Sequence, residues 1–205
     1  MEKRYNEKMT KDDKQILIEL IKQDLKNILS EKRYCHSIST MEKAKQLATI
    51  YNEDIQKTMI TALTHDIAKE MTIEEHLEYS IKNNVELNED DKNSTIILHG
   101  IIGADIVKKQ YSFTDEMCDA IYYHSTGRKN MTMLDKIIFL ADKSEDLRQV
   151  EDADKLRKII EEKGLNEAIL WNIDYNTIPK MIENRRIIHP YSIDARNDII
   201  SKICH

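Results

Sequence analysis

The sequence predicts an all-α fold, and two observations lead to this prediction. Residues that break helices are scarce, because the 205 residues include only 4 glycines and 2 prolines. Apolar residues recur at the three- and four-residue spacing of one helix face, whereas the alternation typical of strands is rare. A chain of this length can bury a sizeable core, and we expect a single domain over residues 1–205.

Predicted helices follow one another along the whole chain. In order, they cover residues 10–29, 33–51, 55–70, 72–83, 94–111, 115–124, 131–147, 152–163 and 166–184, with a last helix around residues 195–197. Thr10 and Thr72 each begin a pattern that resembles a capping box, and Thr114 is expected to cap the helix that follows it. We expect residues 84–95 to form a polar connection without regular structure.

The few glycines and prolines mark specific backbone features. Gly127 suits a left-handed residue after a helix, Gly164 ends a helix, and Pro179 should kink or break the helix that contains it. Gly100 and Gly103 lie inside a predicted helix, where each costs roughly 1 kcal/mol relative to alanine. We therefore expect a neighbouring helix or a ligand to approach the backbone closely at these two positions.

Composition excludes several classes of protein. The net charge of −6 argues against a nucleic-acid backbone as the main partner. Cys35, Cys118 and Cys204 are widely spaced, so we expect reduced thiols and no disulfide framework. The charged N-terminus has no apolar signal region, and no run approaches the roughly 18 apolar residues of a membrane span. We expect a cytoplasmic protein without membrane contact.

The stretch over residues 61–71 is the centre of the sequence. His65 and Asp66 stand side by side in an apolar, helix-like frame. Imidazole and carboxylate groups together suit a divalent transition metal. Consecutive side chains on a helix point about 100° apart, so these two can share an ion only if other helices cover that region. In isolation, the pair could equally be a histidine at a helix end beside a solvated aspartate.

Other candidate ligands lie on further predicted helices. His36, His99, His124 and Asp142 are each flanked by apolar residues. Asp142 directly follows a strongly apolar run, where a carboxylate is costly unless it is paired or bound to a metal. Lys69 lies one turn after the central pair and could meet a phosphate oxygen or remain solvated.

Two further polar residues have simpler interpretations. His76 lies in a charged stretch that matches no motif, and we expect it at the surface. Asp135 lies near the start of its predicted helix, where it could cap the helix or form a salt bridge.

Four segments, HDIAK, HGIIGA, HSTGR and LADKSEDLR, resemble motifs of the HD-domain phosphohydrolase superfamily. Their combination is similar to one branch, the YqeK-type bacterial hydrolases that split diadenosine tetraphosphate symmetrically. The resemblance extends from about residue 33 to residue 197. Relatives commonly have Ile-Glu-Pro between the last aspartate and arginine, whereas this chain has a different stretch over residues 143–147.

The resemblance implies two bound divalent transition-metal ions, with iron expected and manganese as the second option. One ion would be held by His36, His65, Asp66 and Asp142, while Asp66 would bridge to a second ion held by His99 and His124. The resemblance also implies that the catalytic residues are Asp66, His65, Lys69 and Arg148. Expected substrate contacts are Lys69, His99, His124, Ser125, Arg148, Arg186, Ile188 and His189.

The resemblance implies a hydrolase of acid anhydrides that acts on a dinucleoside polyphosphate and releases two ADP. It divides the expected domain into a packing helix over residues 1–30, a metal-binding core over 31–150, and helices over 151–205 that close the nucleotide site. A homodimer is left open. Two alternatives also stand: an HD-type nucleotidase or (p)ppGpp-type hydrolase, and a non-catalytic nucleotide-binding HD module.

Overall fold

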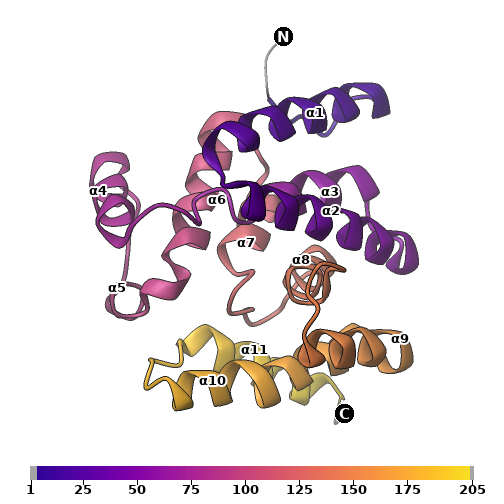
Figure 1. Cartoon of the computed structure of the whole chain (residues 1–205), viewed down its shortest axis with the longest axis vertical. Coiled ribbons are helices and arrows are strands. Elements are labelled where there is room, and N and C mark those ends of the chain that lie inside the picture. Colours follow the sequence, from indigo (N-terminus) through magenta and orange to yellow (C-terminus); the bar gives the residue numbers. More distant parts are fainter. Residues whose placement is uncertain (1–3, 204–205) are drawn as a thin grey trace.

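A computed structural model describes residues 4–203, and its regular structure is helical. No strand occurs within this range, and the all-α prediction is confirmed. The helices stack in layers, with α1 (Lys11–Ile28) at one end of the molecule and α10 (Ile178–Glu183) and α11 (Pro190–Ile203) at the other (Figure 1). Cys204 lies outside the described residues.

The middle of the molecule is built from α2 (Glu31–Tyr51), α3 (Ile55–Thr64) and α8 (Met133–Ser144), which pack against one another. α1 covers α3 from one side. Its buried apolar residues are Leu17, Ile18, Ile21 and Leu25. Both α3 and α8 are buried over most of their length, as their apolar sequences require. The core therefore lies around the two helices that lead into the HD and LADK segments.

A helical pair, α6 (Leu98–Tyr111) and α7 (Asp115–Tyr122), packs beside this core. The expected close approach occurs at Gly100, where an added Cβ would lie 2.9 Å from the carbonyl oxygen of Tyr122. At Gly103 the nearest atoms to an added Cβ would be side-chain methyl groups of Ile67 at 3.3 Å and Ile121 at 3.6 Å. The first glycine thus lets the two backbones meet, and this contact brings the start of α6 against the end of α7.

The C-terminal layer contains the interruptions that the sequence predicts. α9 (Glu151–Asn172) changes direction at Gly164, whose φ of 83° is not helical. A π-helical turn (Ile173–Thr177) then leads into α10, with Pro179 in its first turn, where proline fits a helix. Gly127 also adopts the left-handed conformation, with a φ of 72°.

Several boundaries differ from the prediction. The central helix ends at Thr64 instead of residue 70, because residues 65–70 form tight turns. α8 ends at Ser144, three residues early, before a loop. The expected polar connection contains a short helix, α5 (Glu89–Asn93), with its own capping box between Asn88 and Asp91.

Caps and buried polar contacts fix the helices around the core. The capping boxes at Thr10 and Thr72 and the cap at Thr114 are present. Asp135 forms a capping box with Thr132 at the start of α8 and also accepts a hydrogen bond from Arg128 at 2.9 Å. Asp135 therefore both caps α8 and forms a salt bridge, which are the two roles that the sequence predicts as alternatives.

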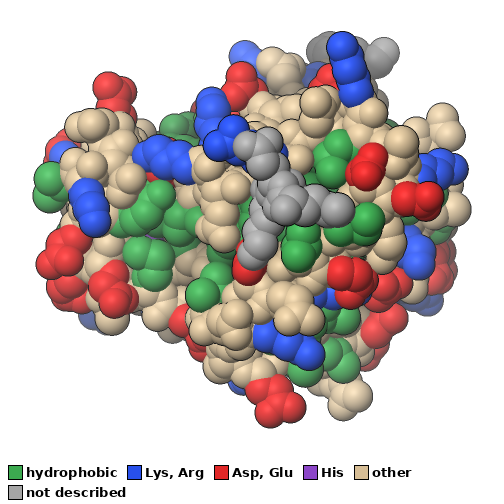
Figure 2. All heavy atoms as spheres, turned by 90° about the horizontal axis from the view of Figure 1, so that it is seen from above, with side chains coloured by type: hydrophobic (Ala, Val, Ile, Leu, Met, Phe, Trp, Pro, Cys, Tyr) green, Lys and Arg blue, Asp and Glu red, His purple; other side chains and the backbone are tan. Residues whose placement is uncertain are grey.

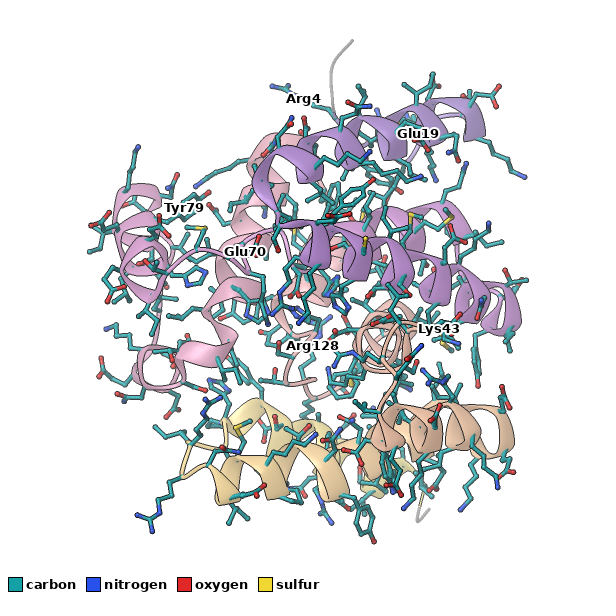
Figure 3. All side chains as sticks on the ribbon, in the orientation of Figure 1. Arg4, Glu19, Lys43, Glu70, Tyr79 and Arg128 are labelled. Carbon is teal, nitrogen blue, oxygen red and sulfur yellow. The ribbon has the colours of Figure 1, made fainter. Side chains whose placement is uncertain are left out.

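The expectation for His76 is wrong. Its side chain is buried in α4 (Ile73–Asn83), where its Nε2 lies 2.9 Å from the carbonyl oxygen of Ala68. This histidine therefore anchors α4 to the turn that follows α3. Glu70, in that same turn, accepts a hydrogen bond from the backbone N–H of Ser30 and lies beside the start of α2 (Figure 3).

The surface is mixed in charge. On the face seen from the α1 side, basic and acidic side chains are interspersed, and no histidine of the described residues is visible (Figure 2). Within residues 4–203, no helix is long and apolar enough to cross a membrane.

The contact at Gly100 generates a prediction about stability. A Gly100→Ala variant should lower the free energy of unfolding by about 1–3 kcal/mol, because its methyl group would press on the backbone of α7. Urea unfolding followed by circular dichroism measures this change. Gly103→Ala is the matched control and should lose less, since a side-chain methyl can shift. Equal stability of Gly100→Ala and the unchanged chain would contradict the close approach.

Candidate metal centre and adjoining cleft

His65 and Asp66 lie in the turns that follow α3. The backbone N–H of Ile67 bonds to the carbonyl of Thr64, and that of Lys69 bonds to the carbonyl of Asp66. Consecutive side chains still diverge in such turns. The two residues share one cluster because groups from α2, α6 and α8 surround the turns.

Asp66 lies at the centre of this cluster and is buried. Its Oδ1 lies 3.2 Å from Nε2 of His99 and 3.6 Å from Nε2 of His124. Its Oδ2 lies 3.6 Å from Nε2 of His65 and 3.8 Å from Nε2 of His36. Each carboxylate oxygen thus faces a different pair of imidazoles.

Asp142 completes the group on the side of His36. Its Oδ1 lies 3.2 Å from Nε2 of His36 and 3.7 Å from Nε2 of His65. The structure therefore brings all six predicted ligands together, and their donor atoms form three overlapping groups in which all atoms lie within 4.8 Å of one another. Their role as metal ligands stays a prediction.

Hydrogen bonds orient the imidazoles toward the centre. Nδ1 of His65 lies 2.8 Å from the carbonyl oxygen of Ala62, and Nδ1 of His124 lies 2.6 Å from that of Ile121. A carbonyl oxygen only accepts, so each Nδ1 carries a proton and each Nε2 faces the cluster. A metal ion in the cluster would therefore bind these two imidazoles through Nε2.

Burial and charge set the protonation states. Burial lowers the pKa of His99 to about 3 and also lowers the pKa of His124, so both are neutral near pH 7. Burial alone would raise the pKa of Asp66, but His65 and the other imidazoles hold the pKa of this carboxyl well below its usual range. Burial opposes ionisation of Asp142 too, and Lys143 with His36 keeps its pKa low.

The cluster fits a divalent metal. Three of its buried atoms, Nε2 of His36, Nε2 of His65 and Oδ1 of Asp66, have no hydrogen-bond partner. Unpaired buried polar atoms are rare in folded proteins and indicate a missing partner. Four imidazole nitrogens and two carboxylates match the donors that first-row transition metals take, so a cation satisfies these atoms.

Three residues around the cluster were not predicted from the sequence. Glu145 is buried, and its Oε1 lies 3.2 Å from Nδ1 of His36. Arg33 approaches Asp66 at 3.5 Å, and Lys143 donates to the carbonyl oxygen of His124 at 2.9 Å. The sequence offers one indication of these residues, which is their position beside motif residues. Position alone does not show whether a side chain points inward or outward.

A cleft of about 300 Å³ adjoins the cluster and runs between it and the C-terminal layer. Lys69, Asp142 and Arg148 form its wall on the cluster side, and Ile187 and Ile188 lie on the opposite wall. Its size lies at the lower end of the range for small-molecule sites. We refer to it as the C-terminal cleft.

The predicted substrate contacts differ in whether they line this cleft and whether they are paired with other residues. Ser125, Arg148, Lys69 and Ile188 line it. His189 lines it too but is buried, and its Nε2 is paired with Oδ1 of Asp91 at 3.2 Å. This pair ties the C-terminal segment to α5.

Other predicted contacts lie outside the cleft. Arg186 is exposed and is not among its lining residues. His99 and His124 lie in the cluster instead of the cleft wall.

The first comparison with known proteins concerns the family. The HD domain matches residues 33–147, which include the six clustered residues. In structure, the chain is similar to a protein from Clostridium acetobutylicum that is described as a predicted HD superfamily hydrolase involved in NAD metabolism. The two share 40% identity with a TM-score of 0.85, over 90% of this chain and 97% of that one.

Relatives similar in sequence carry a more specific name. Proteins named symmetrical bis(5'-nucleosyl)-tetraphosphatase are 34% identical in Staphylococcus aureus, 32% in Bacillus subtilis and 35% in Halalkalibacterium halodurans. The matches cover 88%, 86% and 84% of this chain, and 93%, 94% and 91% of those proteins. The similarity thus extends well beyond the six clustered residues.

The contact between Glu145 and His36 generates a prediction about metal retention. A carboxylate that holds the second nitrogen of a ligating imidazole fixes its orientation, and its loss typically weakens metal affinity by about 10- to 100-fold. Glu145→Ala should therefore lower the affinity for Mn²⁺ by this amount, as measured by competition with a chelator.

Asp146→Ala is the matched control. Asp146 is exposed, and its carboxylate pairs with Lys43 at 3.2 Å, which reaches it from α2 (Figure 3). This variant should bind metal as the unchanged chain does. If both variants lost metal equally, the contact with His36 would not be the cause.

Proposed function

The chain belongs to the HD domain family, and we propose that it hydrolyses diadenosine tetraphosphate symmetrically, giving two ADP, with two divalent ions held by the cluster. One observation carries the proposal: the two carboxylate oxygens of Asp66 face separate pairs of imidazoles beside a cleft with cationic walls. The full-length relatives named above carry the same activity in their names.

The ligands divide into two sets. His36, His65 and Asp142 would hold one ion, His99 and His124 the other, and Asp66 would contact both. When bound, such ions lower the pKa of water and neutralise charge on the attacked phosphoryl group. Imidazole with carboxylate favours iron or manganese over magnesium, and we propose iron, with manganese as a substitute.

The chain's own residues bind and orient the tetraphosphate. Nζ of Lys69 lies 3.7 Å from Oδ1 of Asp66, at the edge of the C-terminal cleft. Arg148 donates to the carboxylate of Asp142 at 2.9 Å, and its guanidinium is 40% exposed, so it still has donors free for phosphate oxygens. Together they place two positive charges where the negative charge of the phosphoryl group increases during the reaction.

The reaction balances with water alone. One water adds to the second or third phosphorus, and the bond from that phosphorus to the central bridging oxygen breaks. The bridging oxygen leaves on one ADP, and the water oxygen stays on the other. Symmetrical cleavage therefore requires that the central pair of phosphates lies at the cluster, with one nucleoside on each side.

The proposed activity predicts the products of purified, iron- or manganese-loaded protein. Chromatography should resolve ADP as the sole product of diadenosine tetraphosphate, with slower turnover of (p)ppGpp and deoxynucleoside monophosphates. Asp66→Ala should lose metal and turnover together, because both sets of ligands share this carboxylate. Asp66→Asn keeps the shape of the side chain and controls for folding.

Two outcomes would contradict this assignment. ATP with AMP as products would move the attacked bond. Turnover of (p)ppGpp or a monophosphate with an inert tetraphosphate would favour an HD-type nucleotidase or (p)ppGpp-type hydrolase instead, and metal binding without any turnover would favour a non-catalytic module.

The position of Lys69 gives a second kinetic prediction. Lys69→Gln should reduce kcat by about 10²- to 10³-fold, the usual effect of removing one preorganised charge from such a site. Metal content should stay unchanged, because Lys69 is not among the six predicted ligands. Loss of metal from this variant, as measured by plasma emission, would show that Lys69 supports the cluster instead.

A further inference from the structure

The cluster borders a second hollow, beside α2. This distal pocket has a volume of about 510 Å³ and lies between the first turn of α2 and the loop after α8. Lys32 and Arg33 line it from α2, and Leu147 and Val150 line it from the loop. His36 and Glu145 form its inner end, so the pocket reaches a predicted metal ligand directly.

The distal pocket and the C-terminal cleft meet at the cluster. Asp142 lines the cleft and His36 lines the distal pocket, and their facing atoms are 3.2 Å apart. Arg148 lines both hollows. A chain of phosphates that passes over the cluster beside Arg148 therefore has one end in each hollow.

The proposed substrate needs such an arrangement. Diadenosine tetraphosphate has two identical halves, and cleavage at its centre leaves one nucleoside diphosphate on each side of the attacked bond. The C-terminal cleft, at about 300 Å³, is small for more than one half. The second half must lie on the other side of the cluster, where the distal pocket is.

The lining of the distal pocket suits a nucleoside diphosphate. Arg33 and Arg148 pair with the two carboxylates of the cluster and so bring positive charge to the part near it, where phosphates would lie. Lys32 adds a further positive charge to the lining. Leu147 and Val150 are 59% and 55% exposed, so their apolar surfaces are available to a base. Leu147 is the last residue of the stretch where the sequence departs from the Ile-Glu-Pro pattern of its relatives, and Val150 follows three residues later.

We propose that the distal pocket is the subsite for the second nucleoside diphosphate half of the substrate, the half that lies outside the C-terminal cleft. This inference rests on the proposed function. It assigns the two halves to opposite sides of the cluster, with Arg148 between them.

Two matched variants test the subsite. Val150→Asp places a carboxylate in the distal pocket, and Ile187→Asp places one in the C-terminal cleft, at a residue that is 46% exposed. Val150 is the N-cap of α9, a position where aspartate is favoured, so this variant should fold. The probes are ADP and a diadenosine tetraphosphate whose central phosphorus atoms are joined by methylene, each titrated calorimetrically into manganese-loaded protein.

Val150→Asp should weaken binding of the methylene analogue about tenfold and leave the affinity for ADP unchanged, since ADP occupies the cleft. Ile187→Asp should weaken both. If Val150→Asp binds the analogue with wild-type affinity and still forms ADP from the tetraphosphate, the subsite is overturned and the proposed function stands. A wild-type chain that forms no ADP would overturn the proposed function, and the subsite with it.

Discussion

The burial of one carboxylate, Asp66, is the constraint on which the rest of the structure depends. A buried ionised carboxylate is costly unless charged or hydrogen-bonding groups surround it. Here four imidazoles and Lys69 supply that surrounding, and they keep the pKa of Asp66 low despite its burial. Because those imidazoles come from α2, α6 and the turns after α3 and α7, satisfying one side chain requires these parts of the fold to meet.

Most of the side chains around Asp66 lie at or near the ends of helices. His65 and His124 follow the last residues of α3 and α7, and Asp142 lies in the last turn of α8. His36 lies in the second turn of α2 and His99 in the first turn of α6. At a helix end the backbone can change direction and free carbonyl oxygens are available, so it can both point a side chain inward and fix an imidazole tautomer. The close contact at Gly100 brings two of these ends together.

Much of this arrangement could be predicted from the sequence, because local rules determine it. Spacing of apolar residues, capping boxes and breakers located most helices, and the six ligands implied by the resemblance all lie in one cluster. Their metal-binding and catalytic roles, and the division of the chain into one domain with three parts, remain predictions.

The features that could not be predicted from the sequence depend on contacts between distant segments of the chain. His76 is buried because α4 packs on the turns after α3. The spacing of apolar residues predicts a helix over this stretch instead of turns. The pairs of Glu145 with His36 and of His189 with Asp91 join residues 109 and 98 positions apart. No local pattern encodes such distances, and a charged neighbourhood in the sequence does not show which side chain turns inward.

The cluster alone does not determine which phosphoanhydride bond is cut, since its ions could act on any phosphoryl group brought to them. The distance from the cluster to each nucleoside-binding surface decides the position of the tetraphosphate. We propose that in this chain those surfaces are the C-terminal layer on one side and the loop over residues 145–150 on the other. Arg148 borders both hollows and would contact the phosphates of either half. Under this proposal, symmetrical cleavage is a property of two hollows that meet at one cluster.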